Sequence, residues 1–334
     1  MKTAFSGIAL LGGTALALGL AAASVHAQDE PSMGVVVKIG GIPWFNAMEE
    51  GIAERASEIG MSAEMIGPTS ADPALQVRAI EDLIARGVDV IGVVPNDEAA
   101  LEPVLQKARD AGIKVVAHEG PGLENVDWNF ELASADGFGE AHAKLLCDKV
   151  EEPGSFAVYV GSLTVPLHNA WADAAIAWIE ENCADKLTLV GERYGVAENV
   201  DDSRSTALDV MAANEDLRGF LAFGSQGPIG AGRAIEERRL GGKVHVLGPF
   251  SPGQGQQLLK EGVISGGYMW NPAEAGRVFV TMGKMLVDGE EIADGTEIEG
   301  LGTVSPDTET RNIITDNLLE INADTVDDLA AKGL

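Results

Sequence analysis

Two large aromatic residues, Trp44 and Phe45, stand where an expected strand gives way to a helix. They follow an apolar run at 35–37, the glycine pair at 40–41 and Pro43. In an open parallel sheet, the loop at the carboxyl end of a strand opens onto a ligand crevice. Aromatic rings in this loop suit the apolar faces of a small ligand. The alternative is that they form a hydrophobic staple at the start of the helix.

Lys38 is an unusual residue for the end of a buried strand. A charge there is costly unless it is paired or reaches a wet cleft. Glu119, which follows a later strand with His118, is the expected partner. The alternative for His118 and Glu119 is an ordinary surface pair.

Aromatic, amide, imidazole, hydroxyl and carboxylate side chains follow the expected strands along the whole chain. Sugars and polyols require this combination, because they alternate C–H faces with hydroxyl groups. The predicted ligand-binding residues are Lys38, Trp44, Phe45, Asn46, His118, Glu119, His168, Asn169, Ser225, Gln226, Phe250, Trp270 and Asn271. Structural alternatives remain for His168 and Asn169 as helix-entry caps and for Trp270 as a hinge-packing residue.

The elements that must position these residues alternate between apolar runs and amphipathic segments, as expected for parallel sheets covered on both faces. Gly60, Gly87 and Gly112 follow expected helices, where a left-handed terminus favours glycine. The expected strands lie at 35–40, 62–66, 88–94, 114–118 and 126–132 in a first unit and at 156–160, 187–191, 219–223, 244–247 and 264–269 in a second. Two such units would enclose a cleft between them.

The chain has 334 residues and a formal net charge of −29, which repels phosphate backbones and argues against nucleic-acid binding. Lys2, the apolar run at about 8–23 and small residues before position 28 predict a signal peptide over residues 1–27, hence export. Cys147 and Cys183 could then form a disulfide or remain two separate thiols. No zinc-type spacing, dinucleotide fingerprint or hydrolase motif occurs, so we expect no metal, no cofactor and no enzyme.

Four features are typical of one known family: the predicted signal peptide, the aromatic pair at 44–45, and the segments LIARGVDVI at 83–91 and AGIKVV at 111–116. On these features the chain resembles the type 1 periplasmic solute-binding proteins of ABC sugar importers, the ribose-binding-like family. It implies an α/β fold of two Rossmann-like lobes with parallel sheets, joined by a three-crossover hinge. One lobe would hold residues 33–131 plus about 271–300, and the other 132–270 plus about 301–334.

Within that family the chain looks nearest to the branch of autoinducer-2 and rhamnose receptors. Lys38 falls where the autoinducer-2 receptors carry a ligand-binding lysine, and Glu119 falls near their acidic residue. Leu167-His168 stands in place of their Asp-Gln pair. The resemblance implies a periplasmic, monomeric protein that delivers a sugar or polyol to an ABC importer permease, its sole link to the membrane. The alternative is an autoinducer-2-type signal receptor.

Overall fold

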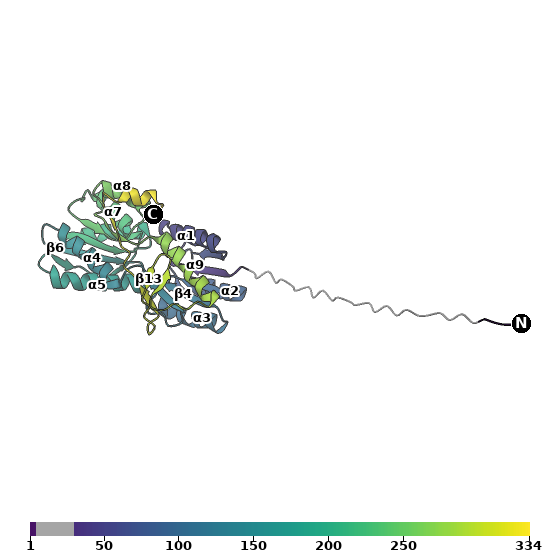
Figure 1. Ribbon diagram of the computed structural model, residues 1–334. Helices are drawn as coiled ribbons and strands as arrows, with labels where there is room; N and C mark the ends of the chain where they lie inside the picture. The colour runs from purple at the N-terminus through teal and green to yellow at the C-terminus, as the bar shows by residue number, and fades with distance from the viewer. Residues whose placement is uncertain (5–29) are drawn as a thin grey trace.

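Two parallel β-sheets form the centres of two lobes in the computed structural model, which describes residues 1–4 and 30–334. The predicted signal peptide therefore lies almost entirely outside the described residues. Figure 1 shows α1, α2, α3 and α9 around one lobe and α4, α5, α7 and α8 around the other. The described helices include none that is long and apolar enough to cross a membrane.

The first lobe is built on a six-stranded sheet of order β14-β5-β4-β3-β1-β2, in which all neighbours are parallel. Its strands are β1 (Ser32–Val36), β2 (Ser62–Ile66), β3 (Val90–Val93), β4 (Lys114–His118), β5 (Trp128–Glu131) and β14 (Asn312–Ile314). The helices α1 (Pro43–Ile59) and α9 (Pro272–Asp288) cover one face, and α2 (Pro73–Arg86) and α3 (Glu98–Asp110) cover the other. Val35 packs toward the first face and Val36 toward the second, which explains the continuous apolar run.

The second lobe has a parallel sheet of order β10-β9-β6-β7, and β8 also pairs with β6. Its strands are β6 (Gly154–Val160), β7 (Leu187–Leu189), β8 (Tyr194–Gly195), β9 (Leu217–Phe223) and β10 (His245–Leu247). The helices are α4 (Ala135–Lys149), α5 (Pro166–Asn182), α6 (Val200–Ala213), α7 (Gly227–Arg238) and α8 (Pro252–Lys260). The expected α/β alternation is confirmed, whereas β8 and α8 have no counterpart among the elements expected from the sequence.

Helix ends follow the predicted glycine chemistry in the first lobe. Gly60 and Gly87 adopt left-handed φ values of 67° and 70° at the ends of α1 and α2, and Gly112 has a φ of 84° just after α3. Residues with a side chain rarely adopt this conformation, so these glycines stop each helix and release the chain into the next strand.

The chain passes between the lobes three times. The crossovers lie between β5 and α4, between β11 (Gly267–Met269) and α9, and between β14 and β15 (Leu319–Ile321). β15 pairs with β11, and α10 (Val326–Ala331) packs against α8, so both belong with the second lobe. The three-crossover hinge is thus as the family resemblance implied.

The tail departs from the expected division at about residue 300. β14 pairs with β5, which places it in the first sheet rather than in the second lobe. The hairpin of β12 (Thr296–Ile298) and β13 (Gly302–Val304) contacts α9 of the first lobe. The boundary expected at about 301 was wrong because a three-residue strand carries too little pattern to show which sheet it joins.

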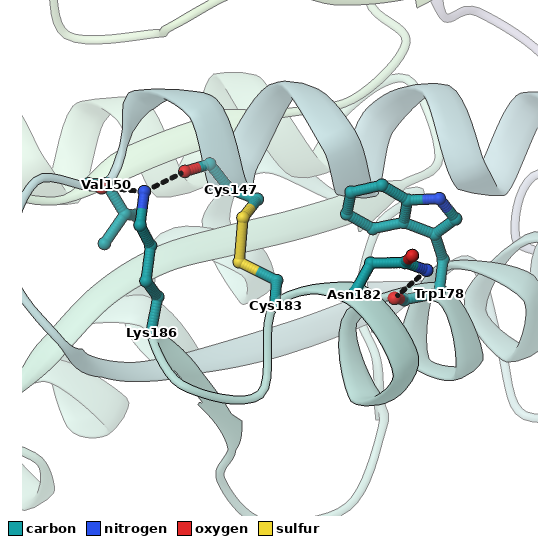
Figure 2. The surroundings of a disulfide bond; sticks show 6 residues. All are labelled: Cys147, Val150, Trp178, Asn182, Cys183 and Lys186. Atoms are coloured by element: carbon teal, nitrogen blue, oxygen red, sulfur yellow. Dashed lines mark hydrogen bonds between the residues drawn. A yellow bond between two sulfur atoms is a disulfide. The ribbon is translucent and has the colours of Figure 1, made fainter.

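Cys147 and Cys183 form a disulfide, one of the two arrangements that the sequence left open. The bond joins the last turn of α4 to the end of α5, with the two Cα atoms 6.3 Å apart (Figure 2). Beside it, the Lys186 ammonium donates to the carbonyl oxygens of Cys147 and Val150, each at 3.3 Å. The cross-link therefore ties two helices of the second lobe together.

Candidate functional site

A cavity of about 270 Å³, including the part open to solvent, lies between the lobes. The first-lobe wall of the cavity is formed by Lys38, Trp44, Phe45 and Glu119. The second-lobe wall is formed by His168, Trp171, Glu198, Gly224, Ser225 and Pro249. Trp270, in the crossover after β11, completes the lining. The lining combines aromatic rings with charged and hydroxyl groups, as is typical of small-molecule sites.

Lys38 and Glu119 form a buried ion pair within the first-lobe wall. Lys38 Nζ lies 2.5 Å from Glu119 Oε2, and both side chains are 2% exposed. Burial opposes ionisation of Glu119, but the ammonium of Lys38 and the nearby imidazole of His168 outweigh it and hold its pKa well below the ordinary value. The pair predicted from the sequence is therefore present in the structure.

The backbone around this pair is held rigidly. Glu119 has a φ of 61°, a left-handed conformation that costs a non-glycine residue roughly 1–3 kcal/mol and is typical of functional sites. The Lys38 carbonyl accepts from Asn96 Nδ2 at 2.9 Å, and the Val37 carbonyl accepts from Gln76 Nε2 at 3.1 Å. The surrounding lobe thus fixes where the ammonium and the carboxylate point.

The second-lobe wall brings His168 and Glu198 to the same ammonium. His168 Nε2 lies 2.7 Å and Glu198 Oε1 3.6 Å from Lys38 Nζ. His168 Nδ1 accepts a hydrogen bond from the Gly161 backbone N–H at 3.1 Å. Burial, reinforced by the Lys38 charge, lowers the pKa of His168, so its imidazole is neutral at pH 7. Lys38 is therefore the point at which the two walls meet.

Aromatic rings from both lobes converge on the crossover tryptophan. The centroid of Trp270 lies 5.5 Å from that of Trp44 in the first lobe and 5.3 Å from that of Trp171 in the second. Trp270 also lies edge-on to His118 at 5.8 Å. A ring that contacts both lobes and the cavity can sense closure around a ligand, and such rings suit the C–H faces of sugars.

The structure brings seven of the predicted residues into the cavity lining. They are Lys38, Trp44, Phe45, Glu119, His168, Ser225 and Trp270. Trp44 and Phe45 sit in the first turn of α1, and Ser225 follows β9.

Three other predicted residues near the first lobe lie outside the lining. Asn46 is exposed on α1, and Asn271 caps α9 by accepting from the Ala273 and Glu274 backbone N–H groups. His118 is buried behind Glu119, with its ring stacked 4.6 Å from that of Phe130. Burial lowers the pKa of His118, so this imidazole is a neutral backing residue.

The remaining three predicted residues support the second-lobe wall from behind. Asn169 Nδ2 donates to the carbonyls of Ser162 and Val165, so it ties α5 to the loop before it and does not cap the helix. Gln226 Nε2 donates to Ser225 Oγ at 3.1 Å and thereby orients that hydroxyl. Phe250 is fully buried against α8.

Sequence reasoning missed four lining residues, all in the second-lobe wall. Gly224 and Pro249 each lie one residue before a predicted residue and follow β9 and β10. Trp171 lies more than one turn into α5, where the helical spacing of apolar residues predicts a core position and not a ligand contact. Glu198 follows β8, a strand of two residues that leaves no sequence pattern.

Two α/β lobes joined by three crossovers around an aromatic and polar cavity define a two-lobed solute-binding fold. Within the described residues, no group of three or more His, Cys, Asp or Glu side chains is arranged to hold a metal ion. The chain belongs to the periplasmic binding protein domain family, which matches residues 33–291.

Comparison with known proteins agrees with this assignment. The chain is 25% identical over 265 residues to the D-ribose/D-allose-binding protein of Pseudomonas aeruginosa, covering 75% of this chain and 80% of that protein. An ABC transporter solute-binding protein from Clostridium phytofermentas with bound L-rhamnose superimposes with a TM-score of 0.84 at 22% identity, covering 91% and 99% of the two chains. LsrB from Clostridium saccharobutylicum in complex with AI-2 gives a TM-score of 0.82 at 18% identity, covering 89% and 99%. These two structures establish the similarity of fold.

Proposed function

We propose that this protein captures a small uncharged sugar or polyol between its lobes and delivers it to an ABC importer. The observation that carries the proposal is the cavity itself, where aromatic rings of both lobes and the crossover surround the Lys38–Glu119 pair. Aromatic rings stack on the apolar faces of a sugar, and buried charged groups form strong hydrogen bonds with its hydroxyls. The relatives named for ribose, allose and rhamnose support this substrate class.

The role follows from the family, whose members bind sugars and work with ABC importers. Ligand binding would shift an open–closed equilibrium about the three crossovers, and the closed form would dock on a permease. The predicted signal peptide over 1–27 would place the protein in the periplasm. We propose that it acts there as a monomer that binds and releases its ligand unchanged, without a cofactor.

The proposal is tested by thermal denaturation of the mature protein with a panel of neutral aldoses, ketoses and polyols at millimolar concentration. A ligand that binds only the folded state raises the melting temperature, and saturation at 100 times Kd adds roughly 2.7 kcal/mol of stability. Mass spectrometry of small molecules that co-purify with the protein provides an independent identification. If no panel member stabilises the protein and no sugar or polyol co-purifies, the proposal is wrong.

The alternative function is recognition of an autoinducer-2-type signal. It is favoured by Lys38 within the lining and by the similarity of fold to the AI-2 complex of LsrB. On this alternative, autoinducer-2 stabilises the wild type more than any panel sugar does, and Lys38→Ala abolishes the effect. Unchanged affinity for autoinducer-2 in the Lys38→Ala variant would remove the alternative.

A further inference from the structure

Three buried polar atoms in the cavity lining lack a hydrogen-bond partner among the described residues. They are Glu198 Oε2, Trp171 Nε1 and Trp270 Nε1. Their residues are only 7%, 1% and 2% exposed. Buried polar groups in native proteins are normally paired, so a cluster of unpaired ones around a cavity marks groups that a ligand completes. The pattern requires one ligand donor, for the carboxylate, and two ligand acceptors, for the indole N–H groups.

The formal charges of the cavity do not balance. Lys38 contributes one positive charge and Glu119 and Glu198 contribute two negative charges, while His168 is neutral. Lys38 Nζ lies 2.5 Å from Glu119 but 3.6 Å from Glu198, so the positive charge of Lys38 mainly neutralises the carboxylate of Glu119. The uncompensated carboxylate faces the cavity from the second lobe. An acidic group on the ligand would meet a like charge in a site shielded from water.

We propose that Glu198 determines specificity by receiving a hydrogen-bond donor from the solute, so that the cavity takes hydroxylated solutes without an acidic group and rejects acidic ones. The donor is a hydroxyl, while oxygens of the same solute accept from the indole N–H groups of Trp171 and Trp270. This inference rests on the proposed function and deepens it by adding charge selection at a named residue.

The test uses charge-matched sugar triads that share one ring, such as D-glucose, D-glucosamine and D-glucuronate, or the three galactose counterparts. The panel also includes the other neutral aldoses, each with its amino-sugar and sugar-acid derivative where these exist. Affinities come from thermal shift and titration calorimetry on the wild type, Glu198→Gln and Glu140→Gln. The last variant is a matched control, because Glu140 is an exposed carboxylate on α4 of the same lobe.

We expect the acid member of any triad that binds to be weaker than its neutral partner by about tenfold or more. Glu198→Gln should narrow that ratio, mainly by strengthening binding of the acid member, while Glu140→Gln leaves it unchanged. Tighter binding by the amino member than by the neutral member would also show that the Glu198 charge is uncompensated, and it supports charge selection.

Two outcomes count against it, and they are distinguishable. An acid member that binds the wild type as tightly as its neutral partner overturns charge selection, even if Glu198→Gln fails to fold. The same conclusion follows if folded Glu198→Gln keeps the wild-type ratio. In contrast, no binding by any neutral member overturns the proposed function as well.

Discussion

The two walls of the cavity differ in how completely they satisfy their own polar groups. In the first-lobe wall, Lys38 and Glu119 neutralise each other, and Gln76 and Asn96 hold the backbone from behind. In the second-lobe wall, Glu198 Oε2 and Trp171 Nε1 have no partner in the described part of the chain. One wall is complete without a ligand, and the other is completed by it.

The difference indicates a division of labour. A wall whose charges are paired and whose backbone is fixed is preorganised, which reduces the ordering cost of binding. A wall with unpaired groups gains most when a solute arrives, so it supplies the differential affinity that closure requires. Lys38 links the two, because its ammonium belongs to the first lobe and contacts His168 and Glu198 of the second.

The largest expected effect comes from removing the cation that both walls share. Lys38→Met leaves Glu119 buried without its partner, and breaking a buried pair this way typically costs about 3–5 kcal/mol. Urea denaturation of the ligand-free protein measures the loss. Lys107→Met is the control, because its pair with Glu81 is exposed and worth roughly 0–1 kcal/mol.

A second change separates pairing from packing at the same position. Adding Glu119→Gln to Lys38→Met removes the orphaned carboxylate and should restore part of the lost stability. If the double variant is as unstable as the sum of the single ones, the ion pair is not what holds the first-lobe wall together.

The next prediction concerns the lobes rather than the walls. Only the second lobe carries a disulfide, which closes a loop of 36 residues and stabilises by about 3–4 kcal/mol on the chain-entropy model. Cys147→Ala with Cys183→Ala should therefore destabilise the second lobe alone, as read by hydrogen exchange in α4 and α5. Because the bond lies at the far ends of these helices, ligand affinity should be unchanged. Faster exchange in α1 and α9 as well would show that the lobes unfold as one unit.

The same contrast between walls explains what the sequence could and could not predict. Lys38 lies two residues after β1, Glu119 directly follows β4, and Trp44 lies in the first turn of α1, so the strand-end rule finds them. Strands of four or more residues with apolar runs show where those ends are. The two-lobed fold follows from the same alternation.

The second-lobe wall is harder to predict because its residues do not all follow a recognisable strand. Glu198 follows the two-residue β8, and Trp171 reaches the cavity from within α5. Asn271 and Asn169 have the right chemistry, but Asn271 caps α9 and Asn169 donates to backbone carbonyls before α5, and only the hydrogen bonds reveal this. Nor does sequence pattern predict the left-handed backbone of Glu119, which depends on the surrounding loops.

The balance of the first-lobe wall also depends on Glu131, a fully buried carboxyl behind it at the end of β5. Burial raises the pKa of Glu131 well above its ordinary value despite a hydrogen bond from Asn129 Nδ2, and the nearby Glu119 charge adds to the shift. The two glutamates thus have opposite shifts. Glu119 supports folding above its unfolded pKa and loses that effect in acid, whereas Glu131 supports folding at low pH and loses that effect as pH rises through its raised pKa.

Glu131→Gln should therefore remove a loss of stability that the wild type shows as pH rises above the ordinary glutamate range. The effect of one proton is at most about 1.4 kcal/mol per pH unit. Unfolding free energies of both proteins across pH 4–8 measure it, and the difference between them cancels the buried histidines, whose lowered pKa values act in the other direction. Parallel curves would mean that Glu131 is ionised and that the first-lobe wall is not neutral.

The smallest expected effect is the most direct test of the contrast. In the ligand-free protein, Glu198→Gln removes a long contact of 3.6 Å to Lys38 together with a buried carboxylate oxygen that has no partner. The lost attraction and the relieved desolvation oppose each other, so stability should change by less than about 1 kcal/mol. Urea denaturation of Glu198→Gln beside Lys38→Met then compares the two walls directly. If the free energy of unfolding falls by more than about 2 kcal/mol, the second-lobe wall needs Glu198 for folding. A carboxylate that the ligand-free protein requires has a structural role, and it is not a group held in reserve for the solute.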